Sequence, residues 1–173
     1  MEVHNMAEPD APKSLVVRVA LWIATGLGFG YSPFVPGTVG AIWGIPLALI
    51  LMRIPSISCQ ISALVALYLV GIPICTSAAR CLGKKDPGAV VWDEIVTVPI
   101  AFLLVDPRLM NKPALLLIGF VLHRVFDISK PWPIRNIEKL PDGTGIMTDD
   151  VVAGAYACIM MHLLLWIWPW LSR

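Results

Sequence analysis

Apolar residues occur along this chain in six stretches separated by short polar connections. The stretches are Leu15–Gly30, Val39–Met52, Ile57–Thr76, Ile95–Val105, Ala114–Leu122 and Val151–Leu171. Ile57–Thr76 runs for 20 residues and Val151–Leu171 for 21. At about 1.5 Å per residue, either is long enough to cross the ~30 Å hydrocarbon layer of a membrane. The pattern predicts an all-α protein with helices that can span a bilayer.

The remaining stretches are shorter or interrupted. Leu15–Gly30 contains an arginine and several glycines, which favours an interfacial or partly buried helix. Ile95–Val105 and Ala114–Leu122 are too short to span alone, so they borrow flanking residues, re-enter the membrane or pack inside the protein. We expect one compact helical membrane domain over residues 14–173, with about four to six hydrophobic helices. Residues 1–13 are expected to form a disordered N-terminal tail.

Composition narrows the class of protein further. Hydrophobic residues make up 57% of the 173 residues and charged residues only 14%, and the mean hydropathy is +0.76. An average soluble domain carries roughly 25% charged residues. Seven tryptophans suit the boundary between lipid and water, although a soluble protein with an unusually apolar core is the alternative. The net charge of +1 decides nothing, but no basic stripe appears, so we expect no nucleic-acid partner.

The polar connections predict which side of the membrane the charges face. If the stretches cross as two hairpins and a final helix, residues 77–94 and 123–150 lie on the side of the N-terminus. Residues 53–56 and 106–113 then lie on the other side. The first side carries nine lysine and arginine residues and the second carries four. Because basic residues favour the cytoplasmic side, we expect the longer polar segments, and any site among them, to face the cytoplasm.

Five carboxylates lie beside apolar stretches, at predicted helix ends on this same side. They are Asp93, Glu94, Asp127, Asp149 and Asp150. Helix capping is the simple alternative, because acidic residues stabilise a first turn, and Thr148 is expected to cap a helix that begins with Asp149. An unpaired charge beside apolar segments is costly, however, and Mg²⁺ is usually held by a few carboxylates together with a substrate phosphate. Their joint occurrence predicts a metal site.

Cationic and polar side chains near these carboxylates are candidates for binding a phosphate. Arg135 suits a bidentate contact and Lys130 a point charge, and Arg124 precedes both. Thr38 follows a proline and a glycine and precedes Val39–Met52, so we expect it to cap a helix whose free N–H groups can also hold an anion. A cap without a ligand is the alternative. No P-loop, GxSxG or HExxH motif accompanies these residues.

Four sequence blocks resemble the phosphatidylglycerophosphatase A family. They are SPFVPGTVG at 32–40, VVWDEIV at 90–96, FVLHRVFDISKPWPI at 120–134 and GTGIMTDDVVAG at 143–154, in the family's order. The resemblance implies a multi-pass, Mg²⁺-dependent phosphatase of the bacterial inner membrane. Its expected phospholipid substrate is phosphatidylglycerophosphate and its product phosphatidylglycerol. Ala41 and Thr97 stand where the family often has Ser and Gly, which bears on helix packing more than on activity.

Carried over by position, the resemblance gives catalytic and Mg²⁺-binding roles to the five carboxylates, with Lys130 and Thr38 in accompanying motifs. We expect metal-assisted attack by water, with one carboxylate as general base and with Lys130, together with Arg124 or Arg135, stabilising the phosphate oxygens. An aspartyl-phosphate intermediate is the mechanistic alternative.

Two non-enzymatic classes compete with this interpretation. A small transporter or ion-binding subunit would place its ionisable residues near the middle of the spans, whereas these are predicted near helix ends. A membrane-anchored scaffold would give no reason for carboxylates and cations to gather on one face. The sequence leaves the oligomeric state open.

Overall fold

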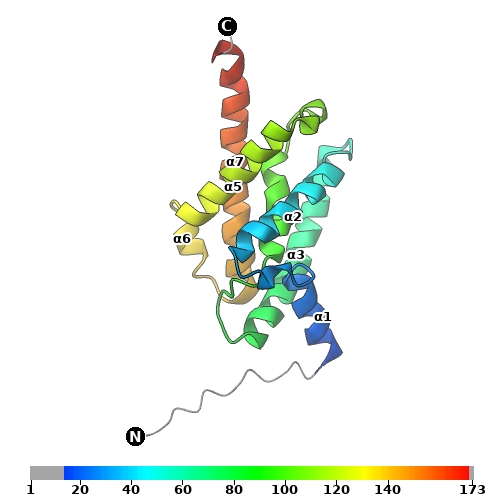
Figure 1. Cartoon of the computed structure of the whole chain (residues 1–173), viewed down its shortest axis with the longest axis vertical. Coiled ribbons are helices and arrows are strands. Elements are labelled where there is room, and N and C mark those ends of the chain that lie inside the picture. The colour runs from blue at the N-terminus through cyan, green and yellow to red at the C-terminus, as the bar shows by residue number, and fades with distance from the viewer. Residues whose placement is uncertain (1–13, 172–173) are drawn as a thin grey trace, which may run out of the picture.

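The computed structural model describes residues 14–171, and the regular elements among them are all helical. Five longer helices carry the fold: α1 (Leu15–Ala24), α2 (Pro36–Leu51), α3 (Ile57–Cys81), α5 (Pro113–Ser129) and α7 (Asp142–Leu171). Shorter elements connect them: η1 (Phe29–Tyr31), α4 (Trp92–Thr97), η2 (Val98–Phe102), η3 (Pro107–Asn111) and α6 (Ile134–Ile137). Helix α7 packs along α3 and α5, and α2 packs on α4 and η2 (Figure 1). The predicted all-α class is confirmed, while the tail predicted at 1–13 lies outside the described residues.

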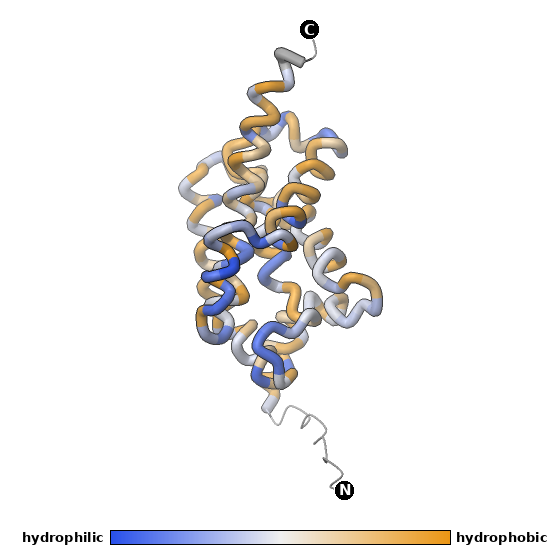
Figure 2. Tube along the Cα trace, turned by 90° about the vertical axis from the view of Figure 1, so that its left-hand side faces the viewer, coloured by the Kyte–Doolittle hydropathy of each residue, from blue (hydrophilic) through white to orange (hydrophobic). Residues whose placement is uncertain are grey.

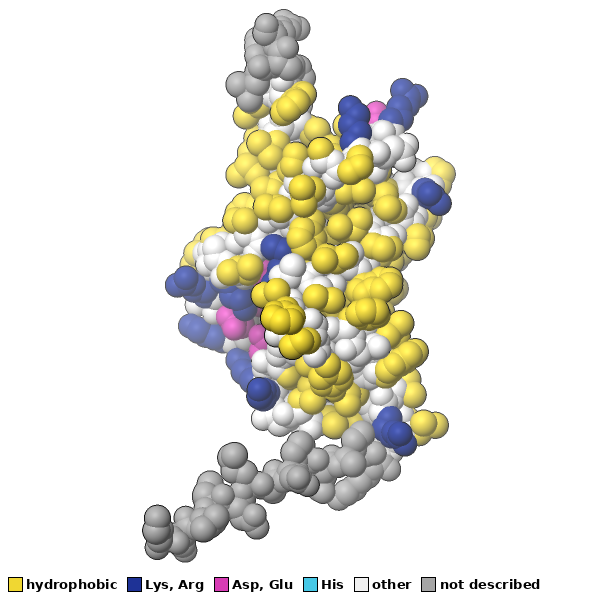
Figure 3. Space-filling view, in the orientation of Figure 1, with side chains coloured by type: hydrophobic (Ala, Val, Ile, Leu, Met, Phe, Trp, Pro, Cys, Tyr) yellow, Lys and Arg dark blue, Asp and Glu magenta, His cyan; other side chains and the backbone are white. Residues whose placement is uncertain are grey.

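Two helices are long and apolar enough to cross a membrane. They are α3, with 25 residues, and residues Asp142–Trp168 of α7, with 27. Only 22% of the most apolar window of each is buried inside the protein. The core helix of a soluble protein is mostly buried, so apolar surface left open on two such helices fits contact with lipid. Figure 3 shows apolar side chains covering most of the visible face.

Polar segments gather in two regions that are separated by apolar surface (Figures 2 and 3). In one region, the turn after α2 meets η3, and a common surface pocket is lined by Met52, Arg53 and Pro55 from the turn and by Pro107, Met110 and Asn111 from η3. In the other region, residues 85–90 meet the end of α5, α6 and the start of α7 around two adjoining pockets. This is the grouping of segments that the hairpin arrangement predicts. Which region faces the cytoplasm stays a prediction.

The two short apolar stretches have different outcomes. Ala114–Leu122 belongs to α5, which continues to Ser129 for a total of 17 residues, so this stretch borrows flanking residues. Ile95–Val105 forms the end of α4 and all of η2, and most of its side chains are buried. This second stretch therefore packs inside the protein and does not form a separate span.

Helix α7 begins two turns earlier than the sequence predicts. It starts at Asp142, so Thr148 is not a cap but lies inside the helix, where its hydroxyl donates to a carbonyl one turn earlier at 2.6 Å. The earlier start depends on α3, because the N–H of Gly143 donates to the Thr76 hydroxyl at 2.9 Å. That contact satisfies a first-turn donor for which the local sequence offers no cap.

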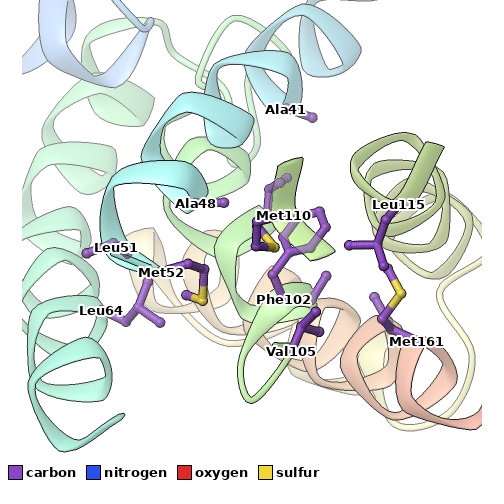
Figure 4. Packing of buried hydrophobic residues seen from close by; sticks show 13 residues of the cluster. Ala41, Ala48, Leu51, Met52, Leu64, Phe102, Val105, Met110, Leu115 and Met161 are labelled. Atoms are coloured by element: carbon purple, nitrogen blue, oxygen red, sulfur yellow. The ribbon is translucent and has the colours of Figure 1, made fainter. Parts of the chain in front are cut away.

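Phe102 lies in the larger hydrophobic core, which joins η2 to α2, α5 and α7 (Figure 4). Its ring is fully buried and lies against Gly119 of α5. A Cβ added at Gly119 would lie only 2.3 Å from the ring carbon Cε1 of Phe102. A residue without a side chain therefore lets α5 approach η2, and this contact fixes α5 against the segment that continues from α4.

Gly119→Ala should lower the midpoint of thermal unfolding in detergent, because the added methyl group overlaps the Phe102 ring. Overpacking of this kind costs roughly 1–3 kcal/mol. In a Phe102→Leu background the same change should cost less, because the ring atoms that it meets are gone. Leu117→Ala, at an exposed position of the same helix, is the control and should change the midpoint little. Equal losses for Gly119→Ala in both backgrounds would contradict this contact.

Candidate active site

One pocket of about 280 Å³ brings together the carboxylates predicted from the sequence. Asp93 and Glu94 come from the first turn of α4, and Asp127 comes from the last turn of α5. Asp149 and Asp150 come from about two turns inside α7, so the expectation that they open a helix is wrong. Three segments that are far apart in the sequence thus supply one acidic site, and capping does not explain the α7 pair.

Arg124 joins the carboxylate of α4 to that of α5. Its Nη1 donates to Glu94 Oε1 at 2.8 Å and to Asp127 Oδ2, and all three side chains are largely buried. The C-terminus of a helix disfavours negative charge, so the position of Asp127 in the last turn of α5 costs stability by itself. Its contact with Arg124 offsets that cost.

Lys130 links the end of α5 to the acidic part of α7. Its Nζ donates to Asp149 Oδ2 at 3.0 Å and pairs with Glu138 Oε1 at 3.2 Å. Burial disfavours the charged form of Lys130, but its contacts with Asp149 and Glu138 outweigh burial and raise its pKa above the ordinary value. Lys130 is therefore a permanent cation at the edge of the pocket.

Asp93 and Glu94 are both buried, and of the two only Glu94 has an ion pair among the described residues, with Arg124. Within the part of the chain that the structure describes, Asp93 Oδ1 and Glu94 Oε2 have no hydrogen-bond partner. Burial raises the pKa of Asp93 well above its usual range, and the neighbouring Glu94 raises it further. Burial also raises the pKa of Glu94 to about 8, against the opposing effect of Arg124. A cation placed beside these two carboxylates would stabilise their ionised forms.

The N-terminus of α2 opens onto the same pocket. Helix α2 begins at Pro36, so Thr38 is not the cap but lies in the first turn, and residues 35–38 all line the pocket. First-turn N–H groups have no partner within their helix, and together with the helix dipole they can hold an anion. The absence of a side chain at Gly40 lets α2 lie close to Val91 and Glu94. A Cβ at this position would lie 2.4 Å from Val91 Cβ and 2.7 Å from Glu94 Oε2. A helix end suited to anions therefore adjoins carboxylates suited to cations.

Asp86 lines the pocket and was missed in the sequence. Asp86 is exposed in the loop before α4, follows two lysines and adjoins no apolar stretch. Its local sequence is therefore that of an ordinary charged surface residue. It also lines a second cavity of about 230 Å³. Arg135 lines this second cavity and not the carboxylate pocket, and its Nη2 lies 3.5 Å from the Ser129 carbonyl oxygen. Phosphate binding by Arg135 stays a prediction.

His123, the neighbour of Arg124 in the sequence, does not line the pocket. It is fully buried, and its Nε2 lies 3.0 Å from the hydroxyl of Thr97, which donates its own proton to the Asp93 carbonyl at 2.7 Å. The Nε2 atom therefore carries the imidazole proton and donates to Thr97. Thr97 stands where the resemblance leads one to expect glycine, and here its hydroxyl ties α5 to α4.

The donor set fits a hard divalent cation. Six carboxylates and two cationic side chains, Arg124 and Lys130, line the pocket, so four negative charges are uncompensated when every group is ionised. Mg²⁺ prefers such oxygen ligands and usually keeps several of its waters. Within residues 14–171, no three His, Cys, Asp or Glu side chains converge as a ready-made metal cage. An open pocket that supplies a few carboxylates suits a partly hydrated Mg²⁺ better than it suits a fully enclosed ion.

Fold and site together define a class of protein. The chain forms a helical bundle with apolar outer surfaces, and an acidic pocket in it adjoins a helix end that can bind an anion. This combination is typical of chemistry on a phosphate group at a membrane surface.

The chain belongs to the phosphatidylglycerophosphatase A family, whose family model matches residues 22–165. The phosphatidylglycerophosphatase A of Escherichia coli is 33% identical over 165 residues, which cover 92% of each chain. That of Haemophilus influenzae is 38% identical over 140 residues, which cover 80% of this chain and 84% of the relative. A Bacteroides thetaiotaomicron protein named as a candidate phosphatidylinositol-3-phosphatase is 39% identical over 149 residues, covering 84% of this chain and 92% of its own.

No solved structure matches this chain. The family confirms the resemblance seen in the four sequence blocks, and the chain is an enzyme, a hydrolase that acts on phosphoric monoesters. Neither the transporter nor the scaffold alternative agrees with that membership.

Gly40→Ala should weaken both the fold and the site. The added Cβ meets Val91 close to its backbone, so α2 and α4 must move apart and Glu94 must shift. We expect a loss of roughly 1–3 kcal/mol in unfolding free energy together with a displaced Glu94 side chain. Gly88→Ala is the control for thermal unfolding, because its Cβ would meet nothing nearer than Pro36 Cγ at 3.9 Å. Indistinguishable melting midpoints for the two variants would argue against close packing at Gly40.

Proposed function

We propose that this chain hydrolyses the terminal phosphate monoester of phosphatidylglycerophosphate to phosphatidylglycerol and phosphate, with Mg²⁺ bound among the pocket carboxylates. One observation carries the proposal: carboxylates from α4, α5 and α7 meet the N-terminus of α2 in a single pocket. The names of the Escherichia coli and Haemophilus influenzae relatives support the substrate.

The proposed location is the bacterial inner membrane, with several helices crossing it and the pocket facing the cytoplasm. The exposed apolar surfaces of α3 and α7 support membrane embedding. The excess of basic residues among the segments around the pocket supports a cytoplasmic orientation.

In the proposed mechanism, Asp93, Glu94, Asp127, Asp149 and Asp150 are the candidate Mg²⁺ ligands. Bound Mg²⁺ supplies charge neutralisation at the phosphate and a water of lowered pKa. Arg124 holds Glu94 and Asp127 in place, and it neutralises phosphate oxygens together with Lys130 and the first-turn N–H groups of α2. One carboxylate accepts the proton of the attacking water, which bonds to phosphorus as the bond to the glycerol oxygen breaks, and the leaving oxygen takes a proton from solvent to become the hydroxyl of phosphatidylglycerol.

An aspartyl-phosphate intermediate is the alternative route, in which a carboxylate attacks phosphorus before water does. Acid quenching during turnover of substrate labelled on its terminal phosphate distinguishes the two routes. Label that remains on the denatured protein would exclude direct attack by water.

Asp127→Asn and Asp150→Asn should each reduce phosphate release from phosphatidylglycerophosphate by roughly a hundredfold or more, because each removes a pocket carboxylate. Asp106→Asn is the matched control. Asp106 accepts a hydrogen bond from the Arg108 N–H outside the pocket, and asparagine can make the same bond, so activity should persist. The measurement is phosphate released in detergent micelles, with and without Mg²⁺, from folded variants. Full activity in both pocket variants would refute the proposed site.

A panel of lipid phosphates tests the substrate. Phosphatidylglycerophosphate should be hydrolysed with a higher kcat/KM than phosphatidate or phosphatidylinositol 3-phosphate, the latter chosen because of the name of the Bacteroides relative. Faster hydrolysis of either comparison lipid would leave the phosphatase chemistry in place but replace the proposed substrate.

Mg²⁺ affinity should rise with pH. Burial raises the pKa of Asp93, and that of Glu94 to about 8, so part of the site is protonated near neutrality and binding must displace those protons. For the proton displaced from Glu94, affinity should increase up to about tenfold per pH unit below about pH 8 and level off above it. Calorimetry in buffers of different ionisation enthalpy counts the protons released. Glu94→Gln should flatten the dependence, and an affinity that stays constant across this range in the unmodified protein would contradict the prediction.

A further inference from the structure

An apolar groove of about 370 Å³ lies along α5 beside the start of α2. Phe120, Val121, Val125 and Ile128 line it, together with Ser129. Two further lining residues, Thr38 and Arg124, also line the carboxylate pocket. The groove and the pocket are therefore continuous, and they meet at these two side chains.

The wall of the groove is an unpartnered face of α5. Val121, Val125 and Ile128 follow one another at intervals of four and three residues, which places them on the same side of the helix. Their side chains are 45%, 51% and 70% exposed. An apolar helix face that runs up to a charged pocket provides surface for a molecule with an apolar part and a charged part.

Arg124 stands where the two parts of such a molecule would meet. Its Nη1 is held inside the pocket by Glu94 and Asp127, while the residue also borders the groove. Long basic side chains commonly lay their carbon stems on apolar surface and keep their charge in a polar region. With the terminal phosphate in the pocket, the polar glycerol and phosphodiester of the headgroup would pass Arg124 and Thr38, and the acyl chains beyond them would lie beside Val121 and Val125.

We propose that this groove receives the glycerol backbone and the first part of an acyl chain of the lipid substrate, which enters the pocket sideways between α2 and α5. The proposal rests on the proposed function and adds its specificity determinants. Val121, Val125 and Ile128 select a lipid phosphate over a soluble phosphomonoester, and Arg124 and Thr38 mark the point where the headgroup passes into the pocket.

Another apolar groove supplies a control. It has a volume of about 380 Å³, is lined by residues of α3, η2 and α7 together with Leu103, and shares no residue with the carboxylate pocket. A lipid bound there would not place its phosphate among the carboxylates. Val65 lines this second groove and is 49% exposed, against 51% for Val125, so Val→Trp changes at the two positions are closely matched.

The experiment compares Val125→Trp with Val65→Trp on two substrates that have the same headgroup, dioleoyl and dibutyryl phosphatidylglycerophosphate, in detergent micelles. Val125→Trp should raise KM for the dioleoyl lipid about tenfold, the equivalent of losing the burial of roughly two methylene groups, with kcat nearly unchanged. KM for the dibutyryl lipid should change little, because its short chains do not reach along the groove. Val65→Trp should leave both substrates unaffected.

Several outcomes would overturn the proposal. Equal effects of Val125→Trp and Val65→Trp would show that the groove on α5 has no special role. Equal effects of Val125→Trp on both lipids would point to damage in the carboxylate pocket. A changed oligomeric state by light scattering, with KM unchanged, would assign the groove to a second copy of this chain. If the unmodified protein hydrolyses neither lipid, the proposed function itself fails, and the assignment of the groove to this substrate fails with it.

Val125→Ala covers the case in which the tryptophan variant does not fold. This change does not narrow the groove but removes apolar contact with an acyl chain. It should therefore raise KM for the dioleoyl lipid a few-fold and leave KM for the dibutyryl lipid unchanged. An unchanged KM for the dioleoyl lipid in a folded Val125→Ala protein would also count against the groove.

Discussion

Six carboxylates share a pocket with only two cationic side chains, and the rest of the structure is arranged around this excess of negative charge. Burial of ionised carboxylates is costly unless charge or hydrogen bonds compensate it. Arg124 and Lys130 each contact two carboxylates, yet Asp93 and Glu94 keep unpartnered oxygens and raised pKa values. A pocket with this imbalance is unfavourable by itself and becomes favourable when it binds a cation, which is why Mg²⁺ is the proposed occupant.

Close helix packing keeps these charges in position. The segment from α4 through η2 is buried, so Asp93 and Glu94 stand at the start of a packed element and not in a loop. Gly40 brings α2 against this segment, and Gly119 brings α5 against its other end at Phe102. Buried helices hold side chains more rigidly than loops do, and a site that must keep like charges together needs that rigidity.

The names of the relatives share a phosphatase reaction but differ in the lipid substrate. Proteins of similar identity to this chain are named for phosphatidylglycerophosphate in two cases and for a phosphoinositide in a third. Removal of a phosphate monoester is the step that these names share. Discrimination among lipids must then depend on groups that contact the headgroup, whereas the apolar groove along α5, continuous with the pocket, suits the acyl chains that these lipids share. An amphipathic substrate needs both the charged pocket and the apolar groove, because each of them binds only one part of it.

The sequence by itself determined the helical class, the two longest apolar helices, the family and the five carboxylates, because hydrophobicity and motif residues are local properties of the chain. Only the tertiary structure decided that α7 begins at Asp142, that Ile95–Val105 packs inside the protein, that Asp86 joins the pocket and that Arg135 lines a separate cavity. Each of these depends on contacts between distant segments, such as Gly143 with Thr76. Local composition does not encode which remote partner satisfies a helix end or closes the wall of a pocket.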